Sequence, residues 1–258
     1  MTRDDPEIVA TTVPRRARRA KEAAVGDTTG GRPPSWVLDE VASAGRENLD
    51  VEHVRRYDQK EDADADAEVS LLEGLGLHAG SRVVDLGAGT GQLSLAVARI
   101  CAQVVTVDVS PVVVAHLRAR LEDAGRDNVE VVQAGFLTYE HHGPPADVVY
   151  SRFALHHLPD FWKVVALDRI HGMLRPGGVL RLWDVVYAHE PAEVVERIEA
   201  WCATFDREVG DDEWGRADLE EHVRDEHSTF RWLLEPMIER CGFDIEQATH
   251  SSDGFFGR

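Results

Sequence analysis

Three closely spaced glycines follow an apolar run and could form a ligand-binding turn. Val83, Val84, Asp85 and Leu86 are followed by glycine at positions 87, 89 and 91. Glycine lets the backbone adopt positive φ and approach a ligand closely, and the first N–H groups of a helix that begins there have no partner within the helix. Such a turn can hold a polar or charged part of a nucleotide-like cofactor. The sequence therefore indicates a cofactor site at residues 83–91.

A second carboxylate follows farther along the chain. Asp108 ends the apolar run 104–107, and a carboxylate at the end of a buried strand can accept both hydroxyls of a ribose. Ser110 and Pro111 then supply the cap and the first-turn proline of another helix. The order of strand, glycine turn, helix, strand, acid and helix predicts a βαβα unit with an adenosine-type ligand.

The spacing of the glycines separates two kinds of cofactor. A dinucleotide fingerprint has the form G-x-G-x-x-G, and its third glycine packs the helix against the strand. Here Gln92 stands at that position and the third glycine is Gly91. The form G-x-G-x-G, with Asp85 two residues before it, resembles motif I of the class I S-adenosylmethionine (SAM)-dependent methyltransferases.

Three later segments resemble further motifs of this family in the same order. Gly135 and Phe136 match the positions that flank the adenine, although the family most often has an acid where this chain has Gly135. Residues 146–160 resemble motif IV with the helix after it, and residues 173–184 contain the L-x-P-G-G turn into the fifth strand. The chain is thereby identified as a member of this family rather than a nicotinamide dehydrogenase.

The resemblance implies SAM as the cofactor and assigns its site residue by residue. The glycine loop would wrap the amino-acid end of SAM. Asp85 would anchor that loop or reach the methionine ammonium through water, and Asp108 would accept the ribose hydroxyls. The cofactor-binding residues expected are Asp85, Gly87, Ala88, Gly89, Gly91, Asp108, Val109, Gly135, Phe136, Ser151 and Arg152.

The elements that must position these residues are predicted to form an α/β fold. Apolar β-branched runs alternate with helical patterns, which is typical of a parallel sheet covered on both faces. Together with the resemblance, this predicts a doubly wound, seven-stranded, mostly parallel sheet with an N-terminal helical lid. Within the lid, Ser35 is expected to cap a helix through Val41. The expected divisions are a flexible basic tail at 1–33, the lid helices at 34–80, the SAM-binding core at 81–185, a helical insertion over the substrate pocket at 186–240, and antiparallel C-terminal strands of the core sheet at 241–258.

Composition excludes several partners. The net charge of −19 repels phosphate backbones, and no basic groove is visible, so nucleic acid is not expected as a substrate. No apolar stretch approaches the roughly 20 residues of a membrane helix, so no membrane partner is expected. The three cysteines are far apart and form no C-x-x-C pair, which indicates reduced thiols in a cytoplasmic protein. The sequence carries no signal for an oligomeric state.

The acceptor side contains two candidate catalytic residues. Residues 151–158 resemble a segment of the phosphoethanolamine methyltransferases in which the histidine matching His157 works with an N-terminal tyrosine, and Tyr57 is the candidate for that partner. The aspartate of that segment is Phe153 here, which weakens the analogy with one particular substrate. Paired histidines at this helix start are also common in the family as packing or capping residues, and that alternative stays open for His156 and His157.

Other polar clusters are expected to have structural roles. The acidic run at 61–68 fits a solvated helix face whose carboxylates favour the helix N-terminus. The pair His141 and His142, just before Gly143, fits a polar turn. No metal site is predicted.

The function expected is transfer of a methyl group from SAM to an oxygen, nitrogen or carbon atom of a small-molecule acceptor. The resemblance leaves two alternatives: a SAM-binding regulatory or scaffold protein without turnover, and a protein methyltransferase. The sequence does not identify the acceptor.

Overall fold

The computed structural model describes residues 8–13, 34–45, 47–60, 63–205, 214–251 and 254–257. Most of the expected tail at 1–33 and the acidic stretch at 206–213 lie outside these residues. In the described part of the chain, no helix is both long and apolar enough to cross a bilayer.

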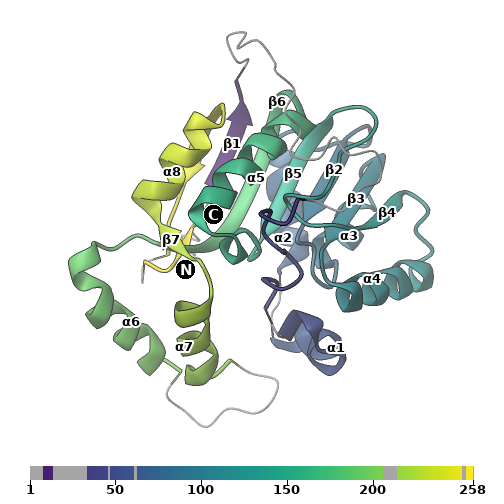
Figure 1. Ribbon diagram of the computed structural model, residues 1–258. Coiled ribbons are helices and arrows are strands. Elements are labelled where there is room, and N and C mark those ends of the chain that lie inside the picture. Colours follow the sequence, from purple (N-terminus) through teal and green to yellow (C-terminus); the bar gives the residue numbers. More distant parts are fainter. Residues whose placement is uncertain are drawn as a thin grey trace.

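A twisted sheet forms the centre of the fold (Figure 1). Strands β2, β3, β4, β5 and β6 run parallel, with Val84 opposite Val105 on one side of β2 and opposite Val149 on the other. The expected doubly wound, mostly parallel α/β fold is confirmed. Along the sheet the seven strands follow the order β4 (Val129–Gln133), β3 (Gln103–Asp108), β2 (Arg82–Leu86), β5 (Ala146–Arg152), β6 (Leu174–Tyr187), β1 (Ile8–Thr12) and β8 (Phe243–Ala248).

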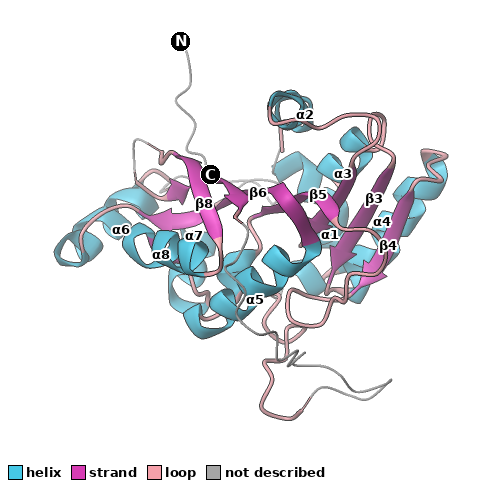
Figure 2. Ribbon diagram, turned by 90° about the horizontal axis from the view of Figure 1, so that it is seen from above, coloured by secondary structure: helices cyan, strands magenta, loops and turns pink. Residues whose placement is uncertain are grey.

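Helices cover both faces because successive strand residues point to opposite sides. Val83 packs with α2 and α3 in one apolar cluster, whereas Val84 packs with α5 and α8 in the other. Figure 2 shows these two helical layers on either side of the strands. The layered helices are α2 (Ala65–Gly74), α3 (Gln92–Val97), α4 (Pro111–Asp123), α5 (Asp160–Met173) and α8 (Arg231–Arg240).

Three more helices lie beyond the carboxyl ends of the parallel strands. Helix α1 (Val51–Lys60) lies beside α4, while α6 (Val194–Ala203) and α7 (Arg216–Asp225) form a separate arm below β7 (Figure 1). Short strand β7 (Thr229–Phe230) pairs in parallel with the end of β6. These helices therefore stand at the edge of the sheet where ligands of open α/β sheets bind.

The expected start of α4 is confirmed. The Ser110 hydroxyl accepts a hydrogen bond from the Val113 N–H, and Pro111 occupies the first turn. A side-chain oxygen at this cap satisfies one of the unpaired helical N–H groups, and proline already has the required φ.

The expectation of a flexible tail is wrong for residues 8–12. Ile8 and Ala10 are completely buried, and β1 runs antiparallel to both β6 and β8. The short run Ile-Val-Ala-Thr-Thr has the β-branched character of a strand, but the basic and polar residues around it dominate the composition of the segment.

The C-terminal residues that were expected to form antiparallel strands of the core sheet form β8 and β9 (Phe256–Gly257), which pair antiparallel with β1 and β6 respectively. Strand β9 does not lie beside β8; its partners are Asp184 and Val185 of β6. The place between β6 and β8 is taken by β1. The N-terminal strand thus completes the sheet, and the C-terminal residues are left to build the wall of a cavity.

The helix expected from Ser35 to Val41 is also wrong, because residues 35–44 form a series of turns. Asp39 accepts hydrogen bonds from the backbone N–H groups of Val41 and Ala42. Such local side-chain to backbone bonds compete with helix formation.

Candidate functional site

One large cavity lies at the carboxyl ends of the parallel strands. Its volume is about 1030 Å³, at the upper end of the range for small-ligand pockets. Its walls come from the glycine loop after β2, the ends of β3, β5 and β6, and helices α1, α6 and α7. Nearly all of the predicted site residues line it: Tyr57, Asp85, Gly87, Ala88, Gly89, Asp108, Val109, Gly135, Phe136, Arg152 and His157.

The glycine loop has the backbone that the sequence predicts. Gly87, Gly89 and Gly91 have φ values of 70°, 53° and 79°, a region that other residues adopt only at a cost. A Cβ at Gly87 would lie 2.3 Å from the Cβ of Ala154, and one at Gly91 would lie 2.3 Å from Leu117. At Gly89 a Cβ would meet nothing within 4 Å. Two of the glycines thus allow close packing, while Gly89 leaves open space in the cavity wall.

The two predicted carboxylates hold this loop in place. Asp108 accepts hydrogen bonds from the N–H groups of Gly89 (3.1 Å) and Ser110 (2.9 Å). Asp85 accepts one from the Ser94 hydroxyl (2.6 Å), which in turn accepts one from Thr106 (2.7 Å).

Both carboxylates are buried, and burial changes their acidity. Burial raises the pKa of Asp85 to about 7, and the nearby Asp108 adds to the shift. Burial likewise raises the pKa of Asp108 to about 6, against the opposing effect of its backbone hydrogen bonds. Loss of water disfavours the charged form of a carboxyl group. Both groups therefore titrate nearer to neutrality than an exposed aspartate does.

Helix α1 is tied to the glycine loop through Asp58. The Asp58 carboxylate accepts hydrogen bonds from Thr90, from Gln92 (3.0 Å) and from Arg120 (2.6 Å). This network places Tyr57, the next residue back on the same helix, in the cavity wall. The predicted lid helix thus reaches the site from the side of the glycine loop.

The turn after β4 is contacted by a distant residue that sequence analysis missed, Glu40. A Cβ at Gly135 would lie 2.3–2.5 Å from the carboxylate atoms of Glu40. Glu40 accepts hydrogen bonds from the Leu137 N–H (3.1 Å) and the Thr138 hydroxyl (3.1 Å), and burial raises its pKa. A carboxylate from a distant turn therefore fills the place that an acidic side chain at Gly135 would occupy. In the sequence, the absence of an acid at position 135 was the only indication that another residue fills this place.

Two predicted residues lie outside the cavity wall. Gly91 packs against Leu117, and Ser151 is completely buried in β5. The next residue, Arg152, does line the cavity, and its guanidinium carbon lies 4.1 Å from the ring centre of Trp183 and 4.5 Å from that of Phe153. Phe153 itself has a φ of 48°, a strained conformation of the kind that recurs at functional sites.

The far end of the cavity is aromatic. Trp201 of α6 stacks on Phe255 with ring centres 4.5 Å apart, and Phe153 lies 5.8 Å from Phe256. The side chain of Trp201 is buried and also lines the cavity. Trp232, by contrast, is half exposed and stacks on Phe230. We call this end the acceptor end, defined by Phe153, Trp183, Trp201, Leu219, Phe255 and Phe256.

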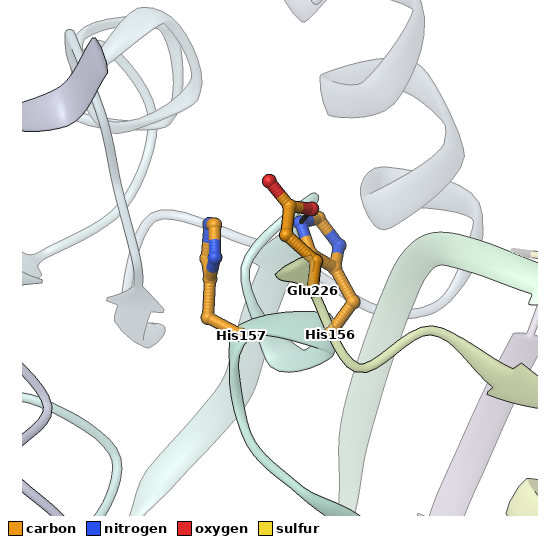
Figure 3. A group of neighbouring side chains, drawn as sticks. All are labelled: His156, His157 and Glu226. Atoms are coloured by element: carbon orange, nitrogen blue, oxygen red, sulfur yellow. Dashed lines mark ion pairs between the residues drawn. The ribbon is translucent and has the colours of Figure 1, made fainter. Parts of the chain in front are cut away.

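A histidine–carboxylate cluster adjoins the acceptor end. His156 contacts Asp184 through Nδ1 and lies 3.0 Å from Glu226 through Nε2. Glu226 also contacts Nδ1 of His222 at the end of α7. Figure 3 shows His156 and His157 on adjacent positions of one turn, with the Glu226 side chain reaching over from a different segment. The rings of the two histidines are 4.4 Å apart.

The two adjacent histidines have opposite acid–base properties. Burial alone would lower the pKa of His156, but the carboxylates of Asp184 and Glu226 raise it to about 10. Burial and the positive charge of His156 together lower the pKa of His157 to about 3. Burial would raise the pKa of Glu226, but its contacts with His156 and His222 hold it well below its usual range. At neutral pH His156 is therefore cationic and His157 is a neutral imidazole.

Comparison with known proteins agrees with this geometry. Residues 83–178 match the family model described as a methyltransferase domain. A carboxy-S-adenosyl-L-methionine synthase from Geobacter metallireducens is 35% identical over 118 residues, 44% of this chain and 48% of that protein. The 27-O-demethylrifamycin SV methyltransferase of Amycolatopsis mediterranei is 32% identical over 120 residues, 46% of this chain and 43% of that protein. The chain spans about half the length of these relatives.

Solved structures share the fold at low sequence identity. The cyclopropane synthase MmaA2 from Mycobacterium tuberculosis superimposes with a TM-score of 0.57 at 19% identity, over 83% of this chain and 78% of that one. A phosphoethanolamine N-methyltransferase from Haemonchus contortus, in complex with S-adenosylhomocysteine, gives a TM-score of 0.60 at 18% identity, over 80% of this chain and 44% of that one. These likenesses show a shared fold.

Proposed function

We propose, from the premise that residues 83–178 match a methyltransferase domain, that the protein is a class I SAM-dependent enzyme that transfers a methyl group from SAM to a small-molecule acceptor. The observation that carries the proposal is the opening at Gly89. Its N–H is fixed by the buried Asp108 carboxylate, and its α-carbon faces empty space in the cavity wall. A polar ligand can thus approach the backbone there while Asp108 lies beside it.

The residues around this opening fit SAM. Gly89 and Ala88 would hold its amino-acid end, Asp108 its ribose, and Phe136 a face of its adenine; all four line the same cavity. We propose that Glu40 supplies the acid that this family most often has at the position of Gly135. Its carboxylate lies 2.3–2.5 Å from where a Cβ at that position would be, and a carboxylate there can accept a hydrogen bond from an adenine amino group.

The two ends of the cavity suit different parts of a methyl transfer. When bound, SAM supplies an electrophilic methyl group on a sulfonium. The acceptor end is lined mainly by aromatic side chains, which favours orientation and desolvation of an apolar acceptor. His157 is a neutral imidazole beside that end, and Tyr57 lines the cavity from the α1 side. We propose both as residues that contact the acceptor and orient it for transfer.

The acceptor we propose is a small, largely apolar molecule with one protonated nucleophile. The cavity has room for a second ligand beside the cofactor, and its acceptor end is aromatic with acidic residues of α7 at the rim, including Asp218 and Glu221. The high negative charge of the chain disfavours nucleic acid as the acceptor.

Turnover with isotopically labelled SAM tests the proposal. The purified chain would be incubated with SAM carrying a labelled methyl group and fractions of a metabolite extract, and mass spectrometry would follow both S-adenosylhomocysteine and labelled products. We expect S-adenosylhomocysteine to accumulate together with a labelled small molecule. Binding of SAM without turnover would instead favour a regulatory protein, and label found in polypeptide would favour a protein methyltransferase.

Two variants test the proposed acceptor contacts. His157→Ala and Tyr57→Phe should lower kcat with labelled SAM by about 100-fold and tenfold respectively, since loss of orientation at the reacting atoms costs of that order. Their affinity for S-adenosylhomocysteine should stay at the native value. Native turnover in both variants would remove the two residues from the mechanism.

A further inference from the structure

Glu226 is a meeting point for imidazoles from two parts of the chain. His156 comes from the turn after β5 and His222 from the last turn of α7, four residues before Glu226. Nε2 of His156 lies 3.0 Å from Oε2 of Glu226, and Nδ1 of His222 contacts the same oxygen. All three residues line the cavity.

Each of these two histidines is held from behind by a second polar group. Nδ1 of His156 contacts the Asp184 carboxylate, which also accepts hydrogen bonds from the N–H groups of His156 (3.0 Å) and Val185 (2.8 Å). Nε2 of His222 lies 2.8 Å from the Ser228 hydroxyl. Asp184 and Ser228 do not line the cavity. One nitrogen of each ring is therefore fixed by an outer partner, and the other is turned toward Glu226.

One buried atom at this place, Nδ1 of His157, has no hydrogen-bond partner among the residues that the structure describes. Beside it, Oε2 of Glu226 meets two imidazoles at once, those of His156 and His222. Buried polar atoms are almost always paired with protein, water or an ion. Candidate ligand atoms of His156, His157 and Glu226 all lie within 4.8 Å of one another.

We propose that His156, His157, His222 and Glu226 bind a divalent transition-metal ion at the border of the acceptor end, where the ion takes the place of the Nε2 proton of His156. Imidazole nitrogens with one carboxylate suit zinc and its first-row neighbours, whereas magnesium prefers oxygen ligands. The outer partners support this assignment, because metal-binding histidines usually donate their other ring N–H to a carboxylate, carbonyl or water. Asp184 and Ser228 stand in those positions.

The sequence does not predict this site because its ligands come from two segments about 65 positions apart. His156 and His157 are adjacent, and His222 and Glu226 have the four-residue spacing that places two side chains on one helix face. The spacing of His222 and Glu226 was the only indication of a metal site that the sequence contained. If the proposed methyl transfer is correct, the ion would lie where it can lower the pKa of an acceptor hydroxyl.

Metal binding to the full chain tests the proposal without any need for turnover. Metal-stripped protein would be titrated with ZnCl₂, CoCl₂ and MgCl₂ by calorimetry, and the cobalt sample would also be followed by visible absorption. We expect about one zinc ion per chain, a cobalt absorption band from nitrogen and oxygen ligands, and no comparable binding of magnesium. Absence of stoichiometric zinc binding by the native chain would overturn the proposal.

Variants locate the ion. Glu226→Gln and His222→Gln should each weaken zinc binding by at least about 100-fold, and Asp184→Asn should weaken it by about 10–100-fold through the outer shell. The two ligand variants are independent, so either one suffices if the other unfolds. A Kd for zinc that is unchanged in a folded ligand variant would overturn the site.

The second histidine pair of the chain provides a matched control. The double variant His141→Ala, His142→Ala removes adjacent histidines from a turn in which His142 is exposed and should leave zinc binding unchanged. A loss equal to that of Glu226→Gln would place the ion on this surface pair and overturn the proposal. Titration with S-adenosylhomocysteine keeps the two proposals apart, since native affinity is expected in every one of these metal-site variants.

Discussion

The two ends of the cavity are built in different ways. The cofactor end takes most of its residues from one segment, 85–136, in which each strand ends beside the next. The acceptor end combines the turn after β5, the end of β6, helices α6 and α7, and the C-terminal strand β9. The first can be predicted from local spacing, whereas the second depends on contacts between segments far apart in the chain.

Replacing two neighbouring glycines should separate packing from binding at the cofactor end, and this is the largest effect we expect. Gly87→Ala should lower the free energy of unfolding by about 2–5 kcal/mol, because its Cβ would clash with Ala154 and its φ is positive. Gly89→Ala should cost only about 1–2 kcal/mol from φ, yet it should weaken binding of S-adenosylhomocysteine. Urea unfolding and calorimetry measure the two quantities. Equal destabilisation by both would contradict the distinction.

The free energy of unfolding should depend on pH in a way that reveals the raised pKa of the buried Asp85 side chain. Because burial raises its pKa to about 7, the folded state favours the neutral carboxyl group, which is stabilising below the unfolded pKa of about 4. That contribution is lost as pH rises from about 4 through 7. The variant Asp85→Asn should gain about 4 kcal/mol relative to the native chain between pH 4 and pH 8, because the two pKa values differ by about three units at 1.36 kcal/mol each. A difference independent of pH, in urea unfolding at several pH values, would show that Asp85 titrates normally.

A pair of variants should show that the two ends act separately. Asp108→Asn should weaken binding of S-adenosylhomocysteine by about 10–100-fold, since a hydrogen bond to a charged group is worth about 1.5–3 kcal/mol. Trp201→Ala should leave that affinity near the native value and raise KM for the acceptor. Calorimetry and steady-state kinetics give both numbers. If Trp201→Ala weakened cofactor binding as much as Asp108→Asn, the ends would not be separable.

The smallest effect concerns Glu40. This residue lies at the cofactor end but, like the residues of the acceptor end, it reaches the cavity from a distant segment of the chain. Glu40→Ala should weaken binding of S-adenosylhomocysteine by about tenfold. Adding Gly135→Asp to Glu40→Ala should restore part of the loss, because the removed carboxylate leaves the space that the new side chain needs. Gly135→Asp alone should be destabilising through its clash with Glu40. Failure of the second substitution to restore any affinity, in a chain that unfolds normally, would remove Glu40 from cofactor binding.

The sequence predicted the sheet and the cofactor end because the information there is local. The apolar runs before Asp85 and Asp108, and the cap at Ser110, each determine a structure within a few residues. The sequence did not predict the features that depend on contacts between residues far apart in the chain. The strand at 8–12 was hidden by the composition around it. The sequence also did not show that β9 pairs with the end of β6, because that pairing joins segments far apart in the chain. Glu40 and Glu226 reach the cavity only through tertiary contacts.

Calorimetric titration of the purified chain with S-adenosylhomocysteine tests the central claim most directly. The native protein should bind one molecule per chain. Affinity should fall by about 10–100-fold in Asp108→Asn and remain unchanged in Glu226→Gln at the other end of the cavity. No binding by the native chain at millimolar ligand, or an equal loss in both variants, would contradict the account.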